Sequence, residues 1–316
     1  YLLRRIIMKR YLLIAMKIKS KFKKVWNSWP IFLIRKSIFL MGESLTGYRH
    51  EKKRFKNSLG YELNLENPSS FSEKVAWKKI YDRDPLLRVT ADKLLVRKYI
   101  AEILGEKQAN EILIPMLAQA RTIDKINFDD LSGDYIIKTN HDSGGNLIIR
   151  EGQKVRREDK SRLKKLSKLP YGTFKHEWAY QGIKPSFIVE RLMLDEAGGI
   201  PKDFKFYVFH GKCHLVHVDF DRFTNHTRSL YTPEWKYLKI MLKFPQGPDI
   251  PRPQNFEKML QLAEKLGQDF GFVRVDLYSI GDRIYFGELT HYPGSGLELF
   301  TPLEFDFELG GHWHLK

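Results

Sequence analysis

The strongest chemical pattern lies in residues 271–290, where charged or polar side chains alternate with apolar ones: Arg274, Asp276, Glu288 and Thr290. Gly281-Asp282 predicts a turn between the two halves, so we expect a β-hairpin. Two carboxylates close together repel each other unless a cation lies between them, and Mg²⁺ with a bound phosphate is the usual solution. The pattern indicates a metal and phosphate site, with an ordinary exposed hairpin of solvated charges as the alternative.

The register of this hairpin decides whether a metal site can form. If Asp276 pairs with Glu288, both carboxylates lie on one face and residues 281–283 form the loop. If Asp276 pairs with Gly287, the loop has two residues and Glu288 lies on the opposite face. The metal interpretation therefore requires the first register.

A second pattern is a strand at residues 135–138 that ends in a lysine, Lys138, and runs into a glycine-rich polar loop. Backbone N–H groups of Ser143, Gly144 and Gly145 can approach a phosphate closely, and the lysine adds charge. The loop lacks the GxxxxGK[ST] order of a P-loop. The alternative is a hairpin turn beside a surface lysine.

Two further groups of charged residues follow strands. Glu190 comes directly after an apolar strand at residues 187–189, where it accepts from an adenine amino group or sits at a solvated strand end. The segment Asp219-Phe220-Asp221-Arg222, with Arg228, contains arginines that can bind a substrate carboxylate through two hydrogen bonds. The alternative for this segment is a salt-bridged strand end.

The elements that must position these residues are helices and antiparallel hairpins, which predicts an α+β fold. A helix is expected from Asp92 to a C-terminal cap at Gly105, a basic helix within 154–168, and a helix at 256–266. A second hairpin is expected at 204–220. Residues 61–90, with Asn67-Pro68 and Asp84-Pro85 as breakers, are predicted to be a connection.

The positive charge is concentrated at the N-terminus. The chain of 316 residues has a net charge of +16, of which residues 1–60 carry +14. Because the rest is nearly neutral, we do not expect a nucleic-acid partner. The single cysteine, Cys213, indicates a reducing compartment.

Residues 1–40 mix short apolar runs with lysine and arginine, and no run approaches the ~20 apolar residues that span a bilayer. A basic amphipathic helix with Trp26 and Trp29 suits an anionic membrane surface. The alternative is a helix that packs on the body of the protein or on a partner.

Taken in order, these features resemble the ATP-grasp superfamily, and within it the TupA-like branch of teichuronopeptide biosynthesis. The resemblance covers residue 90 to the C-terminus. It depends on four groups of residues: Asn67-Pro68 with Phe71-Ser72-Glu73-Lys74, Asp92-Lys93 with Val96-Arg97, Ile137-Lys138 with Asn140-His141, and Phe286-Gly287-Glu288-Leu289-Thr290.

The resemblance implies an ATP-grasp fold in which two α+β subdomains clamp ATP. These subdomains would occupy approximately residues 61–185 and 186–316. Residues 1–60 would form a basic helical segment that binds a membrane or a partner, in place of the Rossmann-like domain that often precedes the clamp.

The resemblance also implies roles for individual residues. Lys93 and Lys138 would contact ATP phosphates under the loop Ser143-Gly144-Gly145, Glu190 with Leu192 would hold adenine, and Asp203 would bind the ribose. The metal ligands for Mg²⁺ would be Asp276, Glu288 and Thr290; many members have asparagine at the position of Thr290. The catalytic residues would be Arg274, Lys205 and Arg222.

By resemblance, the expected activity is that of an ATP- and Mg²⁺-dependent carboxylate–amine ligase that works through an acyl phosphate. Its acceptor would be a uronic-acid carboxylate of a bacterial surface polysaccharide or lipid-linked glycan, and its second substrate an amino acid or another small amine. The expected location is cytoplasmic, peripheral at the inner face of the cell membrane. The alternatives are a sugar or polysaccharide kinase and a glycosyltransferase.

Overall fold

A computed structural model describes residues 29–168, 171–221 and 225–315. Its contacts divide the chain into two compact units, Tyr1–Lys53 and Arg54–Lys316. The division falls within helix α3 (Arg49–Leu59), seven residues before the predicted boundary at residue 60. Trp26 lies outside the described residues, and so does Arg222.

The described part of the first unit contains α2 (Trp29–Leu45) and the start of α3. The buried carboxylate of Glu43 accepts hydrogen bonds from the backbone N–H groups of His50 (2.9 Å) and Glu51 (3.1 Å), which caps α3. One stripe of α2 is apolar and exposed: Ile34, Ile38, Met41 and Leu45. None of the helices described is long and apolar enough to cross a membrane.

The predicted connection at residues 61–90 is wrong, because this segment forms two helices, α4 (Phe71–Tyr81) and α5 (Pro85–Ala91). Ser70 and Glu73 form a capping box at the start of α4. Asp84 caps α5, and Pro85 occupies its first turn. A proline at that position starts a helix because its missing N–H needs no partner there.

The helix predicted from Asp92 begins four residues later, as α6 (Val96–Leu104), and Gly105 caps its end as expected. It is followed by α7 (Glu106–Ile112). Asp92 instead stabilises the turn before α6: one oxygen accepts from the N–H of Leu94 (2.8 Å) and the other from the Asn140 side chain (3.0 Å). This contact ties Lys93 to the glycine-rich loop.

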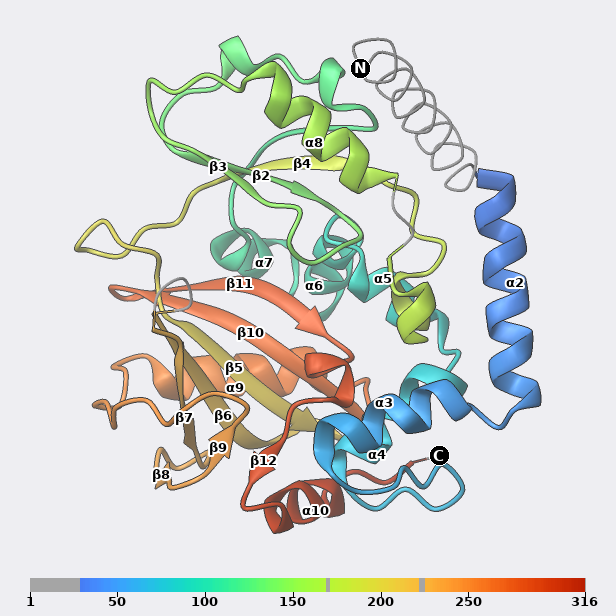
Figure 1. The fold of residues 1–316 in the computed structure, drawn as a ribbon. Helices are drawn as coiled ribbons and strands as arrows, with labels where there is room; N and C mark the ends of the chain where they lie inside the picture. The colour runs from blue at the N-terminus through green and yellow to red at the C-terminus, as the bar shows by residue number, and fades with distance from the viewer. Residues whose placement is uncertain (1–28, 169–170, 222–224, 316) are drawn as a thin grey trace, which may run out of the picture. The chain divides into compact units, whose positions relative to one another are not determined.

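A four-stranded antiparallel sheet has the order β1-β4-β2-β3 and is covered by α8 (Arg157–Ser167) in Figure 1. Its strands are β1 (Met116–Ala120), β2 (Tyr135–Thr139), β3 (Leu147–Ile149) and β4 (Phe187–Arg191). Leu163 of α8 packs in one core with Ile137 and Val189. Strand β4 pairs with β1 and β2, so residues 187–191 belong to the four-stranded sheet, while the division into two subdomains near residue 185 stays a prediction.

The second sheet has six strands in the order β11-β10-β5-β6-β7-β8, and α9 (Phe256–Gly267) covers one face (Figure 1). Its strands are β5 (Asp203–Phe209), β6 (Lys212–Phe220), β7 (Thr227–Tyr231), β8 (Tyr237–Leu238), β10 (Phe272–Ile280) and β11 (Arg283–Thr290). The chain also forms a small pair of strands, a short 3₁₀ segment and a last helix: β9 (Met241–Leu242), β12 (Phe300–Thr301), η5 (Pro293–Gly296) and α10 (Glu304–Gly311). The predicted α+β fold is confirmed.

The two faces of the six-stranded sheet differ in chemistry. Phe206 points toward α9 and stacks on Phe256, with ring centroids 6.0 Å apart. The neighbouring residue Lys205 points to the other face, where it is also buried. The second face therefore carries the charged residues of the site.

Candidate functional site

The register of the β10–β11 hairpin pairs Asp276 with Glu288, as the metal interpretation requires. The predicted loop 281–283 is wrong, because Ile280 pairs with Arg283 and the turn has two residues. A β-bulge at Gly287 adds the residue that brings the acids into register. A Cβ atom at Gly287 would lie 2.9 Å from the carbonyl oxygen of Asp276, so the bulge needs glycine.

Arg274 connects the polar side chains of the hairpin. Its guanidinium donates two hydrogen bonds to Asp276 (2.7 and 2.6 Å) and one to the Thr290 hydroxyl (3.0 Å). It lies 3.5 Å from Glu288, which accepts from Thr290 at 3.0 Å. The two carboxylates and the hydroxyl thus surround one positive charge.

A second cation, Lys205, lies beneath this cluster. It forms ion pairs with Asp203, Asp276 (3.3 Å) and Asp219 (3.5 Å), all of which are buried. Burial opposes its charge, but these carboxylates hold the pKa of Lys205 above its ordinary value. Burial also raises the pKa of Asp276 to about 6, although Arg274 and Lys205 act in the opposite direction.

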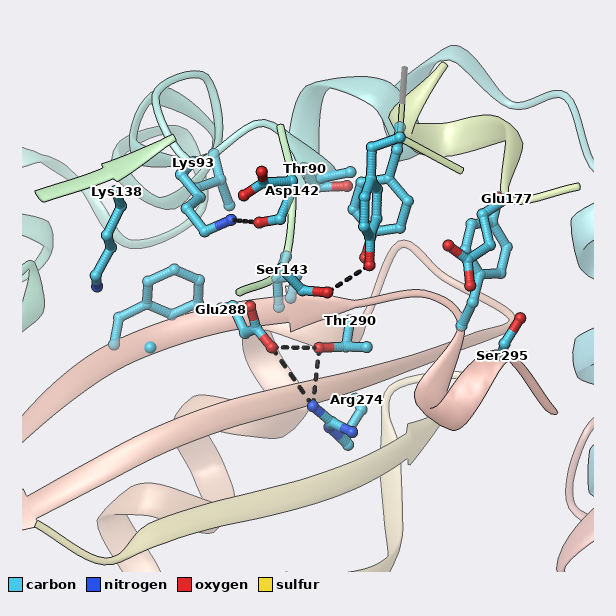
Figure 2. A pocket seen from close by; sticks show the side chains of 18 of the residues that line it. Thr90, Lys93, Lys138, Asp142, Ser143, Glu177, Arg274, Glu288, Thr290 and Ser295 are labelled. Atoms are coloured by element: carbon cyan, nitrogen blue, oxygen red, sulfur yellow. Dashed lines mark hydrogen bonds and ion pairs between the residues drawn. The ribbon is translucent and has the colours of Figure 1, made fainter. Parts of the chain in front are cut away.

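Above the hairpin lies a cavity of about 360 Å³, within the usual size of a small-molecule site. Residues from both sheets line it, and Figure 2 shows Lys93 and Lys138 on the side opposite Glu288 and Arg274. The Glu288 side chain is 46% exposed and points into this space. Val96, Leu113 and Phe286 supply apolar contact area.

One end of the cavity is basic. Lys138 donates to Glu190 at 2.8 Å, and Arg97 lies 3.6 Å from the same carboxylate. The Lys93 ammonium donates to the Asp142 carbonyl oxygen. Burial lowers the pKa of Lys93, although the negative charge of Glu288 acts to raise it. Three cations beside one acid leave an excess of positive charge, which suits an anionic ligand such as a phosphate.

The glycine-rich loop lies at the edge of the cavity. Ser143 lines the cavity and hydrogen-bonds to the Tyr171 hydroxyl, as Figure 2 shows. Gly144 has a φ of +104°, which side-chain-bearing residues rarely adopt. Gly145 approaches Asp142 and Thr139 so closely that a Cβ atom would lie about 3 Å from their oxygens. The glycines shape the loop, but neither lines the cavity.

Several residues singled out in the sequence lie elsewhere. Leu192 and Asp203 are buried and do not line the cavity, and the carboxylate of Asp203 is paired with Lys205. Arg228 is bound to Asp219 (2.9 Å) and Glu298 (3.1 Å), which matches the salt-bridged alternative for that segment. The acceptor role of Arg222 stays a prediction.

The far end of the cavity was not predicted. It is lined by Tyr171, Lys175, Glu177, Tyr180, Tyr292 and Ser295. The first four lie on or beside two single-turn 3₁₀ segments, Thr173–Lys175 and Trp178–Tyr180. Such turns have no hydrophobic periodicity. The cluster of polar and aromatic residues at 171–180 is therefore the one sequence feature that could have indicated this part of the site.

Comparison with known families decides the classification. A model of the TupA-like ATP-grasp family matches residues 73–314. This chain belongs to that family. It therefore has the ATP-grasp fold, in a superfamily of carboxylate–amine ligases that use ATP with Mg²⁺.

Solved structures give weaker similarities. D-alanine–D-alanine ligase from Bacillus anthracis, complexed with ATP, is 16% identical over 64% of this chain and 55% of that one, with a TM-score of 0.39. The corresponding Helicobacter pylori enzyme is 15% identical over 72% and 62%, with a TM-score of 0.38. L-amino acid ligase from Bacillus licheniformis is 14% identical over 66% and 42%, with a TM-score of 0.38.

The chain spans little more than half the length of the first of these structures. Among curated proteins, none matches the sequence significantly.

The residues of the hairpin fit a magnesium ion. Mg²⁺ is held in many enzymes by one or two carboxylates together with substrate phosphates and water. Asp276 and Glu288 provide two carboxylates, and the guanidinium of Arg274 shows that a positive charge is stable between them. In the described part of the chain, no group of three or more histidine, cysteine or acidic residues is arranged to hold a metal ion. Substrate phosphates and water would therefore have to complete the coordination of Mg²⁺ here.

Proposed function

We propose that this protein is an ATP-dependent ligase that joins a carboxylate to an amine through an acyl phosphate. The observation that carries the proposal is a single cavity with Lys93 and Lys138 on one side and Glu288 and Arg274 on the other (Figure 2). The lysines suit phosphate oxygens, and the acids of the hairpin suit Mg²⁺. Family membership supports this assignment.

Each group in the cavity has a role in this reaction. ATP with Mg²⁺ supplies the phosphoryl group that turns a carboxylate into an acyl phosphate, which has a good leaving group. Lys93 and Lys138 would hold phosphate oxygens. Glu288 and Thr290, which line the cavity, would hold the metal ion together with Asp276, which is buried, accepts hydrogen bonds from Arg274 and does not line the cavity. Arg274 lines the cavity and stabilises negative charge that develops during transfer. The loop Ser143-Gly144-Gly145 closes over the phosphates and limits the access of water.

The remaining assignments concern the nucleotide. Glu190 lies in the cavity and would bind the adenine amino group after release from Lys138, with Leu192 behind it. The ribose role that the resemblance gives to Asp203 would require this buried carboxylate to leave its ion pair with Lys205 and reach the cavity. Lys205 is assigned to the support of Asp276, with which it forms an ion pair. These roles follow from the family resemblance and from the positions of Glu190 and Lys205.

For the substrates, we propose a uronic-acid carboxylate of a bacterial surface polysaccharide or its lipid-linked precursor, and an amino acid or another small amine. Membership of the TupA-like family supports this choice. The exposed apolar stripe of α2 supports a peripheral position at the anionic inner face of the cell membrane, where such precursors are assembled.

The test uses oligosaccharides of glucuronic and galacturonic acid with ATP and Mg²⁺. Hydroxylamine is added to trap an acyl phosphate as a hydroxamate. We expect ADP release that depends on the oligosaccharide, and hydroxamate on the sugar carboxylate. Phosphate that stays on a sugar hydroxyl would identify a kinase, and binding of a UDP-sugar without ATP binding would identify a glycosyltransferase. Either result would overturn the proposal.

A further inference from the structure

The far end of the cavity contains a buried acid, Glu177, that has one carboxylate oxygen without a hydrogen bond in the described chain. Glu177 lines the cavity and is only 4% exposed. Its Oε2 atom has no hydrogen-bond partner among the residues that the structure describes. A buried carboxylate oxygen without a partner costs free energy, so the fold retains it against its own stability.

The local backbone is built to place this side chain. The N–H of Glu177 donates to the Gly172 carbonyl oxygen at 2.9 Å and closes a tight turn. Gly172 has a φ of +77°, and a Cβ atom there would lie 2.6 Å from the backbone oxygen of Glu177. Glycine is therefore needed at that position to bring the carboxylate to the cavity wall.

Aromatic rings surround the same end of the cavity. Tyr180 lies between two other tyrosines, with ring centroids 5.1 Å from Tyr171 and 6.1 Å from Tyr292. The Tyr292 hydroxyl accepts from the backbone N–H of Ala179 at 3.2 Å, which fixes its ring beside the Glu177 segment. A carboxylate beside aromatic faces is the environment in which proteins bind ammonium groups.

The charged groups near Glu177 leave room for a cationic ligand. Lys79 is committed to Ser295, whose carbonyl oxygen it reaches at 2.7 Å. Lys175 lies over the Tyr171 ring, 5.6 Å from its centroid. Burial raises the pKa of Glu177, while Lys175, Lys79 and Arg54 act in the opposite direction through space and the Ser295 side chain hydrogen-bonds to the carboxylate. The cavity thus has Lys93 and Lys138 at one end and Glu177, with one oxygen unpaired among the described residues, at the other. Figure 2 shows Glu288 and Arg274 between the two ends.

We propose that Glu177, with the ring faces of Tyr180 and Tyr292, binds the ammonium group of the amine substrate. The proposal rests on the ligase function proposed above, because only a ligase needs a second, cationic substrate in this cavity. The position fits the reaction: an ammonium group held at this end lies across Arg274 and Glu288 from the lysines. After it gives a proton to the Glu177 carboxylate or to solvent, the neutral nitrogen can attack the acyl phosphate, and phosphate leaves.

The decisive variant is Glu177→Gln, which keeps the size of the side chain and removes its charge. The matched control is Glu158→Gln, because Glu158 is 83% exposed on α8 and lies outside the cavity. Binding of the twenty protein amino acids and of ethanolamine is measured by calorimetry on full-length protein saturated with a non-hydrolysable ATP analogue and Mg²⁺. Binding of the analogue itself is measured first.

We expect at least one of these amines to bind the wild type and the Glu158→Gln control equally, and to bind Glu177→Gln at least about tenfold more weakly. That factor corresponds to the loss of one hydrogen bond to a charged group. Binding of the ATP analogue should stay within about twofold, which excludes a collapsed cavity. Equal amine binding by wild type and Glu177→Gln, or no binding of any tested amine to wild type, would overturn the inference.

Hydroxylamine separates this inference from the proposed function. It is uncharged at neutral pH and does not need an ammonium site, so Glu177→Gln should form hydroxamate as fast as the wild type. Absence of hydroxamate with both proteins would refute the ligase function, while amine binding would still report on Glu177. Hydroxamate formation lost only in Glu177→Gln would show that the residue serves the first step, and would refute the amine role.

Discussion

At the scale of single residues, Arg274 connects the polar side chains of the hairpin through hydrogen bonds and an ion pair. It is bound to Asp276, Thr290 and Glu288 at once, and all three are proposed metal ligands. A metal ion held between the two acids would replace contacts that Arg274 makes in this structure. The guanidinium would then be available to the cavity that it already lines. In the proposed function, metal binding and the release of Arg274 would therefore be linked.

This linkage gives a prediction for Asp276→Asn. The amide cannot bind Mg²⁺ as a carboxylate does. It also weakens the ion pairs of residue 276 with Arg274 and Lys205. We expect ADP release to fall by about 10²-fold or more, as for loss of a principal electrostatic element. Steady-state ADP release is the measurement. Asp124→Asn, at an exposed position on the surface, is the control and should keep wild-type turnover. Wild-type activity in Asp276→Asn would remove Asp276 from the metal site.

At the scale of elements, the bulge in β11 controls which face Glu288 occupies. Without the extra residue, the two-residue turn at Gly281-Asp282 would place Glu288 on the face opposite Asp276. Gly287 allows the bulge because a Cβ atom at this position would lie 2.9 Å from the carbonyl oxygen of Asp276. The proposed metal site therefore depends on Gly287, although this residue has no side chain that could bind the metal ion.

We expect Gly287→Ala to lower the free energy of unfolding by about 1–3 kcal/mol, because the added methyl group meets backbone that cannot move aside cheaply. ADP release should also fall, by more than the loss of folded protein accounts for, because Glu288 is displaced. Urea unfolding and ADP release measure the two effects. Gly311→Ala is the matched control, because no atom lies within 4 Å of its added Cβ. A fully active, fully stable Gly287→Ala protein would contradict the role of the bulge.

Strand β6 yields a pH prediction through His217, which is buried beside Asp219 at 2.9 Å. Burial lowers the pKa of His217 to about 4, from an ordinary value of 6.5. Between these values the unfolded chain binds a proton that the folded protein does not, so stability falls as the pH is lowered. The contribution of this residue between pH 7 and pH 5 is about 2 kcal/mol.

Replacing His217 with glutamine should therefore reduce the loss of unfolding free energy between pH 7 and pH 5 by that amount. Urea unfolding at the two pH values measures it, with exposed His50→Gln as the control. Asp219 affects the free energy of unfolding in a different pH range from His217. Despite burial, His217, Lys205 and Arg228 hold the pKa of Asp219 far below its ordinary value, so its contribution is lost only below about pH 4. Identical pH dependence in wild type and His217→Gln would exclude the histidine.

At the scale of the whole molecule, the sequence predicted what local patterns encode. The alternation in 271–290 and the glycine at 105 led to a hairpin and a helix end that the structure contains. The order of lysine, glycine loop, acid and hairpin led to the ATP-grasp family. Each of the hairpin and helix-end signals is local, where period and turn chemistry act directly, while the family resemblance depends on the order of such local signals along the chain.

What the sequence did not predict depends on contacts between distant segments. The bulge at Gly287 shifts the β10–β11 register between Asp276 and Leu277, and the alternating pattern of the two strands does not encode it. Glu177 reaches the cavity through turns without periodicity. Pro85 looked like a breaker because a proline at the start of a helix and one in a loop have the same local sequence.

The N-terminal unit has an exposed apolar stripe on α2, which is the basis for the proposed membrane binding. Ile38 and Met41 are each 62% exposed, and they lie on the same side of the helix as Ile34 and Leu45. Replacing both Ile38 and Met41 with glutamate adds two negative charges where acyl chains and anionic headgroups would lie. We expect sedimentation with anionic liposomes to fall at least about tenfold, because a charge on the apolar face opposes both contributions to binding. ADP release should not change.

The matched control is Ile200→Glu, an exposed apolar position of the second unit that is outside α2. Its liposome binding should equal that of the wild type. Raising the salt concentration should weaken wild-type binding, since part of the attraction comes from basic residues at the surface of the bilayer. If the double variant still sediments with liposomes as the wild type does, α2 does not contact the membrane. A partner protein would then be the occupant to look for on its apolar stripe.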